Sequence, residues 1–131
     1  MNIIAVDDDE HILTMYERLL SQFGTVSGYN NPSKAIDAIL EDNAPCDLLI
    51  VDKQMPDIDG VDFIHRVRSI RKIETMMVSG CEVDADKVCH VKIFNKPFSI
   101  DRFVNHVRSI HTRNPEEIPK HHIGLMNIAI P

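Results

Sequence analysis

Side chains suited to phosphoryl chemistry stand at the ends of four short apolar runs in this chain of 131 residues. These side chains are Asp7, Asp8, Asp52, Ser79 and Lys96. A short apolar run between helical patterns predicts a buried parallel strand, and ligands bind outside the carboxyl ends of such strands. The sequence therefore predicts that three carboxylates, a hydroxyl and an ammonium group meet at one edge of a sheet.

The predicted cluster of Asp7, Asp8 and Asp52 needs a source of positive charge or a proton. Two carboxylates about 4 Å apart repel each other by about 4 kcal/mol at an effective dielectric constant of about 20. Hard oxygen ligands with open coordination positions suit Mg²⁺, and a carboxylate beside that ion can act as a nucleophile and form an aspartyl phosphate. An ammonium group and a hydroxyl could neutralise and orient the phosphoryl oxygens.

Strand and helix patterns alternate five times along the chain. The expected strands are residues 3–6, 25–29, 47–51, 75–78 and 91–94. Helical spacing of apolar residues follows four of them, and only one or two helical turns, at about residues 84–89, fit between the last two strands. Because parallel crossovers are right-handed, this order predicts a three-layer α/β sandwich with helices on both faces.

Local signals predict where the helices begin and which residues they bury. Asp9, Asn31 before Pro32, and Ser99 are expected N-caps, and Gly24 is expected to end the first helix. Gly60 is expected to begin the third helix. The expected inward-facing residues are Phe63, Ile64, Val67 and Ile70 in the third helix, and Ile100, Phe103, Val104, Val107 and Ile110 in the last.

Composition argues against several classes of protein. A formal net charge of −6 with no basic stripe does not favour nucleic-acid binding. The sequence has no long apolar stretch and no basic start typical of a signal peptide, so no membrane association is expected. Three cysteines favour reduced thiols in the cytoplasm, and a zinc site at Cys81, Cys89 and His90 would lack a fourth ligand.

Four motifs follow one another on the expected elements. They are Val-Asp-Asp-Asp-Glu at 6–10, Asp-Lys-Gln-Met-Pro-Asp-Ile-Asp-Gly at 52–60, Val-Ser-Gly at 78–80, and Lys-Pro-Phe at 96–98. In this combination the chain resembles the receiver domain of two-component response regulators over about residues 1–111. The resemblance implies a flavodoxin-like, doubly wound, five-stranded parallel sheet of strand order 2-1-3-4-5, here with a shortened fourth helix.

The resemblance also implies a magnesium-dependent phosphorylation site. It makes Asp52 the acceptor of a phosphoryl group from a sensor histidine kinase or a histidine phosphotransfer protein. It assigns the metal site to Asp7, Asp8, Asp52 and the backbone carbonyl of Gln54, with Asp8 as a direct ligand and Asp7 acting mainly through metal-bound water. The domain would catalyse its own phosphorylation and dephosphorylation, and would switch an output domain or a downstream partner without turning over an external substrate.

Two further residues have implied roles, and two features depart from the family pattern. Ser79 would hydrogen-bond a phosphoryl oxygen, and Lys96 would pair with the phosphate, with a cis peptide bond before Pro97. The family's aromatic switch position is occupied by Ile93, while Phe94 should face the other side of the strand. The spacing from Ser79 to Lys96 is also short. All residues expected for phosphorylation are therefore present, whereas the aromatic residue by which the family usually responds to phosphorylation is absent.

Alternative interpretations remain open at this point. Asp7 followed by Asp9 also fits the Asp-x-Asp motif of haloacid-dehalogenase-type phosphatases, in which Asp7 would be the nucleophile and Asp9 the general acid. A pseudo-receiver that only binds another protein is a second alternative, and a homodimer is left open. Residues 112–131 are expected to form a linker or C-terminal tail, with an apolar segment at 125–130.

Overall fold

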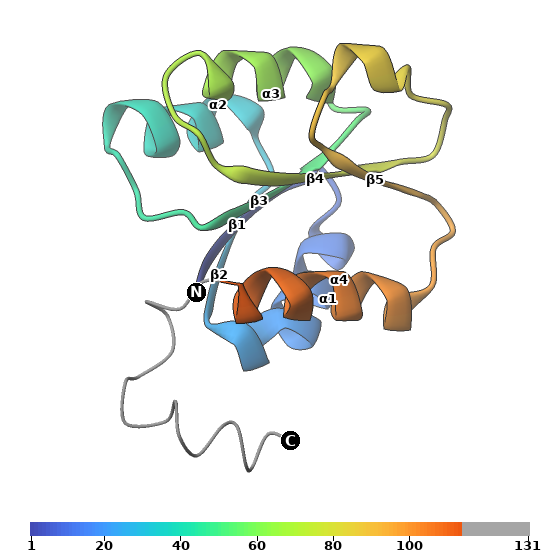
Figure 1. The fold of residues 1–131 in the computed structure, drawn as a ribbon. Coiled ribbons are helices and arrows are strands. Elements are labelled where there is room, and N and C mark those ends of the chain that lie inside the picture. The colour runs from blue at the N-terminus through green and yellow to red at the C-terminus, as the bar shows by residue number, and fades with distance from the viewer. Residues whose placement is uncertain (114–131) are drawn as a thin grey trace.

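Five parallel strands form a single sheet in the computed structural model, which describes residues 1–113 (Figure 1). The strands are β1 (Asn2–Val6), β2 (Thr25–Tyr29), β3 (Leu48–Asp52), β4 (Glu74–Ser79) and β5 (Lys92–Asn95). Their spatial order is β2-β1-β3-β4-β5, and every neighbouring pair is parallel. The predicted α/β fold and strand order are confirmed, and the expected strands lie within about one residue of those observed.

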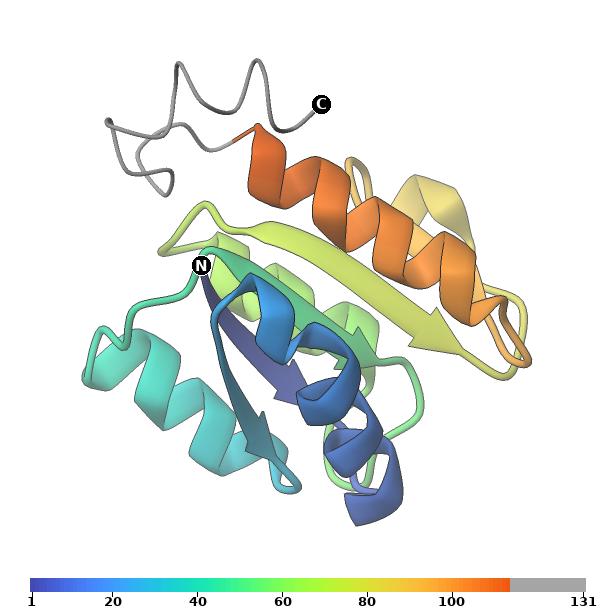
Figure 2. The ribbon, with the colours of Figure 1, turned by 90° about the horizontal axis from the view of Figure 1, so that it is seen from below.

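Helices cover both faces of the sheet. They are α1 (Glu10–Leu20), α2 (Pro32–Ile36), α3 (Gly60–Arg68) and α4 (Ile100–Thr112), and α2 continues into a π-helical turn at Asp37–Glu41. Figure 1 shows α2 and α3 above the sheet and α1 and α4 below it. Figure 2, seen from below, shows α1 and α4 side by side across the strands. Two apolar clusters, one for each layer of helices, form the core.

The expected N-caps are present. The carboxylate of Asp9 accepts a hydrogen bond from the backbone N–H of His11, at 2.9 Å. The side chain of Asn31 accepts the N–H of Ser33, and the hydroxyl of Ser99 accepts the N–H of Arg102. Since each cap is a contact between near neighbours, the start of each helix could be predicted locally.

Two residues predicted to face inward are exposed instead. Ile70 is 67% exposed and Ile100 is 48% exposed. α3 ends at Arg68, so Ile70 lies beyond the helix whose spacing placed it on the buried face. Ile100 is the first residue of α4, and apolar spacing does not tell how far the neighbouring layer extends beneath a helix end. The inward positions of Phe103, Val107 and Ile110 are confirmed.

The fourth helix of the expected fold is reduced to one turn. A single 3-10 turn at Ala85–Lys87 stands between β4 and β5, and Val88 is the one buried residue of 80–90. Two side chains of α3 hold this connection: His65 contacts the carbonyl oxygen of Lys87, and Arg68 donates to those of Cys89 and His90. The shortened helix predicted from the spacing is confirmed.

The expected tail lies largely outside the described residues. The linker and the apolar segment at 125–130 fall within 114–131, so their prediction stays untested. α4 itself runs to Thr112, one residue past the expected end of the domain. In the part of the chain that is described, no helix has the length and apolar character needed to cross a membrane.

Candidate functional site

The predicted site residues lie at the carboxyl ends of four neighbouring strands. Asp7 follows β1, Asp52 is the last residue of β3, Ser79 is the last residue of β4, and Lys96 follows β5. The register joins them across the sheet: Asp52 lies opposite Val78, and the N–H of Lys96 donates to the carbonyl oxygen of Ser79 at 2.7 Å. The sheet therefore brings residues far apart in sequence to one edge, as expected from the strand pattern.

Three carboxylates form the acidic part of this edge. Oxygen atoms of Asp7, Asp8 and Asp52 all lie within 4.8 Å of one another. Asp7 and Asp52 are buried, at 1% and 6% exposure, while Asp8 is exposed. One oxygen of Asp7 accepts the N–H of Asp9, but its other oxygen is buried and has no hydrogen-bond partner in the described structure. That oxygen is a buried acceptor 3.9 Å from Nζ of Lys96.

The burial of these carboxylates raises their affinity for protons. Desolvation raises the pKa of Asp7 to about 6; the hydrogen bond from Asp9 opposes this effect, and the charge of Asp52 adds to it. Desolvation also raises the pKa of Asp52, against the opposing hydrogen bond and charge of Lys96. Desolvation is the largest cause of both pKa shifts, and the repulsion between neighbouring carboxylates that the sequence predicted adds to it.

Lys96 supplies a positive charge to the cluster. Its Nζ donates to Asp52 Oδ1 at 3.0 Å and lies 3.9 Å from Asp7 Oδ2. Desolvation lowers the pKa of Lys96, but the hydrogen bond and charge of Asp52 outweigh it, so the net pKa is raised. The peptide bond between Lys96 and Pro97 is cis, as the family resemblance implied. The ammonium group of Lys96 therefore contacts Asp52, the carboxylate that is expected to accept a phosphoryl group.

The hydroxyl of Ser79 is engaged within its own turn. It donates to the carbonyl oxygen of Cys81 at 2.6 Å and accepts the N–H of Cys81 at 3.0 Å. Ser79 is fully buried and ends β4, which puts it at the site edge. The involvement of Cys81 had no signal in the sequence, because a side chain that bonds to the backbone two residues later needs no particular residue type there.

Contacts between its two ends close the loop that follows Asp52, and the sequence did not predict these contacts. Lys53 Nζ pairs with one carboxylate oxygen of Asp59 at 2.6 Å, while the other oxygen caps α3 through the N–H of Val61. The N–H of Gly60 donates to the carbonyl oxygen of Lys53 at 2.8 Å. A Cβ on Gly60 would lie 2.5 Å from the carbonyl oxygen of Asp52, so only glycine fits. The six-residue spacing of Lys53 and Asp59 matches no helical pair, which is why no pattern predicted their contact.

The donor set fits a hard divalent cation. Asp7, Asp8 and Asp52 offer carboxylate oxygens within reach of one another, and one oxygen of Asp7 is buried without a hydrogen-bond partner in the described structure. Gln54 lies within the loop that Lys53 and Asp59 close, and its backbone hydrogen-bonds to the carboxylate of Asp52. All these ligand atoms are oxygens, and the exposed Asp8 leaves one side open to water, which is typical of Mg²⁺ sites.

The fold and this edge define a receiver domain. The family described as response regulator receiver domain matches residues 3–108, and the chain belongs to that family. The prediction of family membership is therefore confirmed.

Individual relatives support the same assignment. The response regulator ArlR of Staphylococcus epidermidis is 25% identical over 122 residues, which cover 88% of this chain and 55% of ArlR. The transcriptional regulatory protein CpxR of Escherichia coli is 27% identical over 118 residues, 86% of this chain and 50% of CpxR. This chain thus spans about half the length of these two relatives. The crystal structure of the receiver domain from the hybrid histidine kinase CckA is 26% identical, with a TM-score of 0.71, over 85% of this chain and 99% of that one.

Proposed function

We propose that this domain accepts a phosphoryl group on Asp52 in a reaction that requires Mg²⁺. The observation that carries the proposal is the buried Asp52 carboxylate between two other carboxylates and the Lys96 ammonium group, 3.0 Å away. A carboxylate oxygen of Asp52 would attack phosphorus, and the phosphorus–nitrogen bond of a phosphohistidine donor would break. Bound Mg²⁺ would neutralise charge on the phosphoryl oxygens during this transfer.

The remaining site residues would hold the reactants in place. Asp7, Asp8 and the backbone carbonyl of Gln54 would complete the metal ligands with Asp52. Lys96 would pair with a phosphoryl oxygen, for which its proximity to Asp52 is suited. Ser79 would donate its hydroxyl to another phosphoryl oxygen, which requires it to release the carbonyl oxygen of Cys81. Each of these proposed roles is supported by the position of the residue at the site edge.

The proposed partners follow from the family. The donor would be a sensor histidine kinase or a histidine phosphotransfer protein, and the recipient of the signal an output domain or a separate protein. Three free thiols, Cys46, Cys81 and Cys89, favour a reducing compartment such as the cytoplasm. We propose residues 1–111 as the receiver unit and 112–131 as its linker or tail.

The haloacid-dehalogenase-type alternative is not favoured. The family match favours the receiver interpretation. In addition, the carboxylate of Asp9, which would be that enzyme's general acid, caps α1 through the N–H of His11. The pseudo-receiver alternative would leave the contact of Lys96 with Asp52 without a role, and phosphorylation assays decide it directly.

Incubation with a small phosphodonor and Mg²⁺ is expected to add one phosphoryl group to the protein. The modification should be labile to hydroxylamine, as an acyl phosphate is, and chelation of the metal should prevent it. Intact-protein mass spectrometry measures both. A modification that forms equally well in the presence of EDTA, or that survives hydroxylamine, would contradict the proposal.

Asp8→Ala is expected to weaken Mg²⁺ binding by more than about tenfold, because it removes a charged oxygen ligand. Asp9→Ala is the matched control, since Asp9 serves as a cap and its loss costs about 1 kcal/mol of stability. Isothermal titration calorimetry compares the two. Equal losses of affinity would mean that the assignment of ligands within residues 7–9 is wrong.

Activation is expected to change residues 80–90 more than Ile93. Ile93 has no ring to move between exposed and buried positions, whereas the 80–90 connection buries one side chain, Val88, and follows Ser79 directly. Hydrogen exchange with and without beryllofluoride and Mg²⁺ should show altered protection across 80–90. Unchanged protection there, with changes on another face, would refute this expectation.

A further inference from the structure

Lys53 is joined to three different segments at the start of the loop that follows Asp52. Its backbone N–H donates to the carbonyl oxygen of Val78 in β4 at 2.9 Å, and its own carbonyl oxygen accepts the N–H of Gly60 at 2.8 Å. Its side-chain Nζ pairs with Asp59 Oδ2 at 2.6 Å. Lys53 therefore connects β4, the start of the loop and the start of α3.

The two carboxylate oxygens of Asp59 have different partners. Oδ1 accepts the N–H of Val61 and caps α3, while Oδ2 pairs with Lys53. The pair closes residues 54–58 at their two ends, so the path of this segment depends on the Lys53 side chain. The side chains of Lys53 and Asp59 are 21% and 39% exposed, and an ion pair this close to water adds little to the stability of a fold.

Gln54 is the first residue of the closed segment. Its backbone hydrogen-bonds to the carboxylate of Asp52, which holds the residue close to the site. Among the described residues, no donor is bound to the carbonyl oxygen of Gln54. A carbonyl oxygen without a donor is available to a hard cation, provided that the loop keeps it in place.

The charge of Lys53 by itself opposes cation binding. Lys53 lines a cavity of about 580 Å³ together with Asp8, and Asp57 and Asp59 are the other carboxylates of that cavity. An ammonium group here repels Mg²⁺ and lowers the affinity for the ion. Lys53 can favour metal binding only through the loop geometry that it imposes. The effect of its charge and the effect of its contacts therefore have opposite signs.

We propose that Lys53 is a positioning residue for metal binding. Through its ion pair with Asp59 it holds residues 54–58 in the path that lets the carbonyl oxygen of Gln54 bind Mg²⁺. The inference rests on the proposed function, in which that carbonyl is a metal ligand. It gives a role to a side chain that is itself no ligand, and replacing groups that orient metal ligands commonly lowers metal affinity.

Lys53→Met is expected to weaken Mg²⁺ binding by about fivefold, measured by isothermal titration calorimetry on the full chain. Methionine keeps most of the length of the side chain and removes the ammonium group that pairs with Asp59. Loss of the positive charge alone would strengthen binding, since it removes a repulsion. Unchanged or tighter binding by Lys53→Met overturns the proposal.

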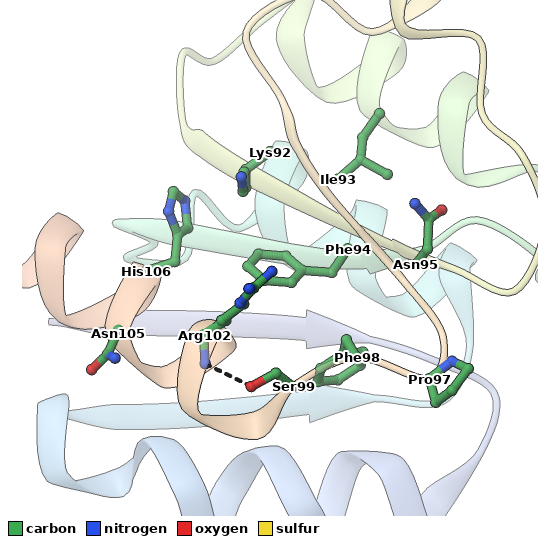
Figure 3. A pocket seen from close by; sticks show the side chains of 10 residues that line it. All are labelled: Lys92, Ile93, Phe94, Asn95, Pro97, Phe98, Ser99, Arg102, Asn105 and His106. Atoms are coloured by element: carbon green, nitrogen blue, oxygen red, sulfur yellow. Dashed lines mark hydrogen bonds between the residues drawn. The ribbon is translucent and has the colours of Figure 1, made fainter.

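Lys92→Met is the matched control, because it removes the same charge from an exposed lysine far from the loop. Lys92 begins β5, at the end of the strand opposite to the site, and lines the cavity beside α4 (Figure 3). Its Mg²⁺ affinity is expected to stay within about twofold of the parent's, since salt screens distant charges. A loss equal to that of Lys53→Met overturns the proposal, because the effect would then not belong to the loop.

A double-mutant cycle tests whether Lys53 acts through Asp59. Asp59→Asn keeps an oxygen that can cap α3 but has no charge to hold Lys53. In this background Lys53→Met is expected to leave Mg²⁺ affinity unchanged or to raise it, because only a repulsion is left to remove. A loss as large as in the parent background overturns the proposal, since Lys53 would then act without Asp59.

Two measurements separate this inference from an effect on folding and from the proposed function. In EDTA, the free energy of unfolding of Lys53→Met in urea is expected to stay close to the parent's. A large loss of stability without metal would assign the ion pair to the fold and overturn the positioning role. A parent chain that binds no Mg²⁺ overturns the proposed function together with this inference, whereas equal binding by the parent and Lys53→Met overturns this inference alone.

Discussion

Asp52→Asn is expected to abolish incorporation of phosphate from a small phosphodonor. The substitution keeps the size of the side chain but removes the nucleophilic carboxylate oxygen and the charge that pairs with Lys96 at 3.0 Å. Mass spectrometry of the intact protein should show no added phosphoryl group under conditions in which the parent protein is modified. The expected effect is complete loss, because no other group at the site is assigned as an acceptor.

Asp57→Asn is the matched control for this experiment. Asp57 is an exposed carboxylate on the same loop and has a positive φ of 72°, which asparagine tolerates well. This variant should be phosphorylated as the parent is. Asp7→Asn should lower the yield through weaker metal binding while the modification still maps to Asp52. Phosphate retained in Asp52→Asn but lost in Asp7→Asn would instead support the dehalogenase-type alternative.

Phe103→Ala is expected to destabilise the domain by about 3–5 kcal/mol, the cost of removing a buried phenylalanine. Phe103 is fully buried under the sheet, where its ring centroid lies 4.9 Å from that of Phe98, 5.3 Å from Phe94 and 5.4 Å from Tyr16. The cavity left behind would remove ring contacts that join α1, α4 and β5. Urea unfolding followed by circular dichroism measures the free energy of unfolding.

Ile100→Ala is the control, because Ile100 lies three residues earlier on the same helix but is 48% exposed. We expect its free energy of unfolding to fall by less than about 1 kcal/mol, as for other surface substitutions. Similar losses at the two positions would mean that α4 buries a different face from the one described.

The strands and the site edge could be predicted because their causes are local or topological. A run such as residues 48–51 is apolar at every position, and only a strand covered on both faces buries all of them. Once the strands are parallel, their carboxyl ends must share one edge. That rule placed Lys96 and Asp52, which are 44 residues apart in sequence, at the same edge, and the structure adds their direct contact.

Other features could not be predicted, since they depend on how far each layer extends. The spacing of Ile70 and Ile100 fits a buried stripe, but one lies beyond the end of α3 and the other in the first turn of α4. The Lys53–Asp59 pair arises from the path of a loop, for which sequence spacing carries no period. The contacts of His65 and Arg68 could not be predicted either, because their partners are backbone carbonyl oxygens, which every residue type has.

The sequence by itself determined the class of fold, the caps of the helices and the identity of the residues at the site edge, because apolar periodicity and capping are properties of neighbouring residues. Only the tertiary structure decided the state of those residues. In the structure the hydroxyl of Ser79 donates to the carbonyl oxygen of Cys81, and one oxygen of Asp7 has no hydrogen-bond partner within residues 1–113. The 80–90 connection packs on α3, and among the described strands β5 pairs with β4 alone. Burial, charge and hydrogen bonding at these positions depend on groups brought together from distant segments, and such proximity is a property of the packed chain.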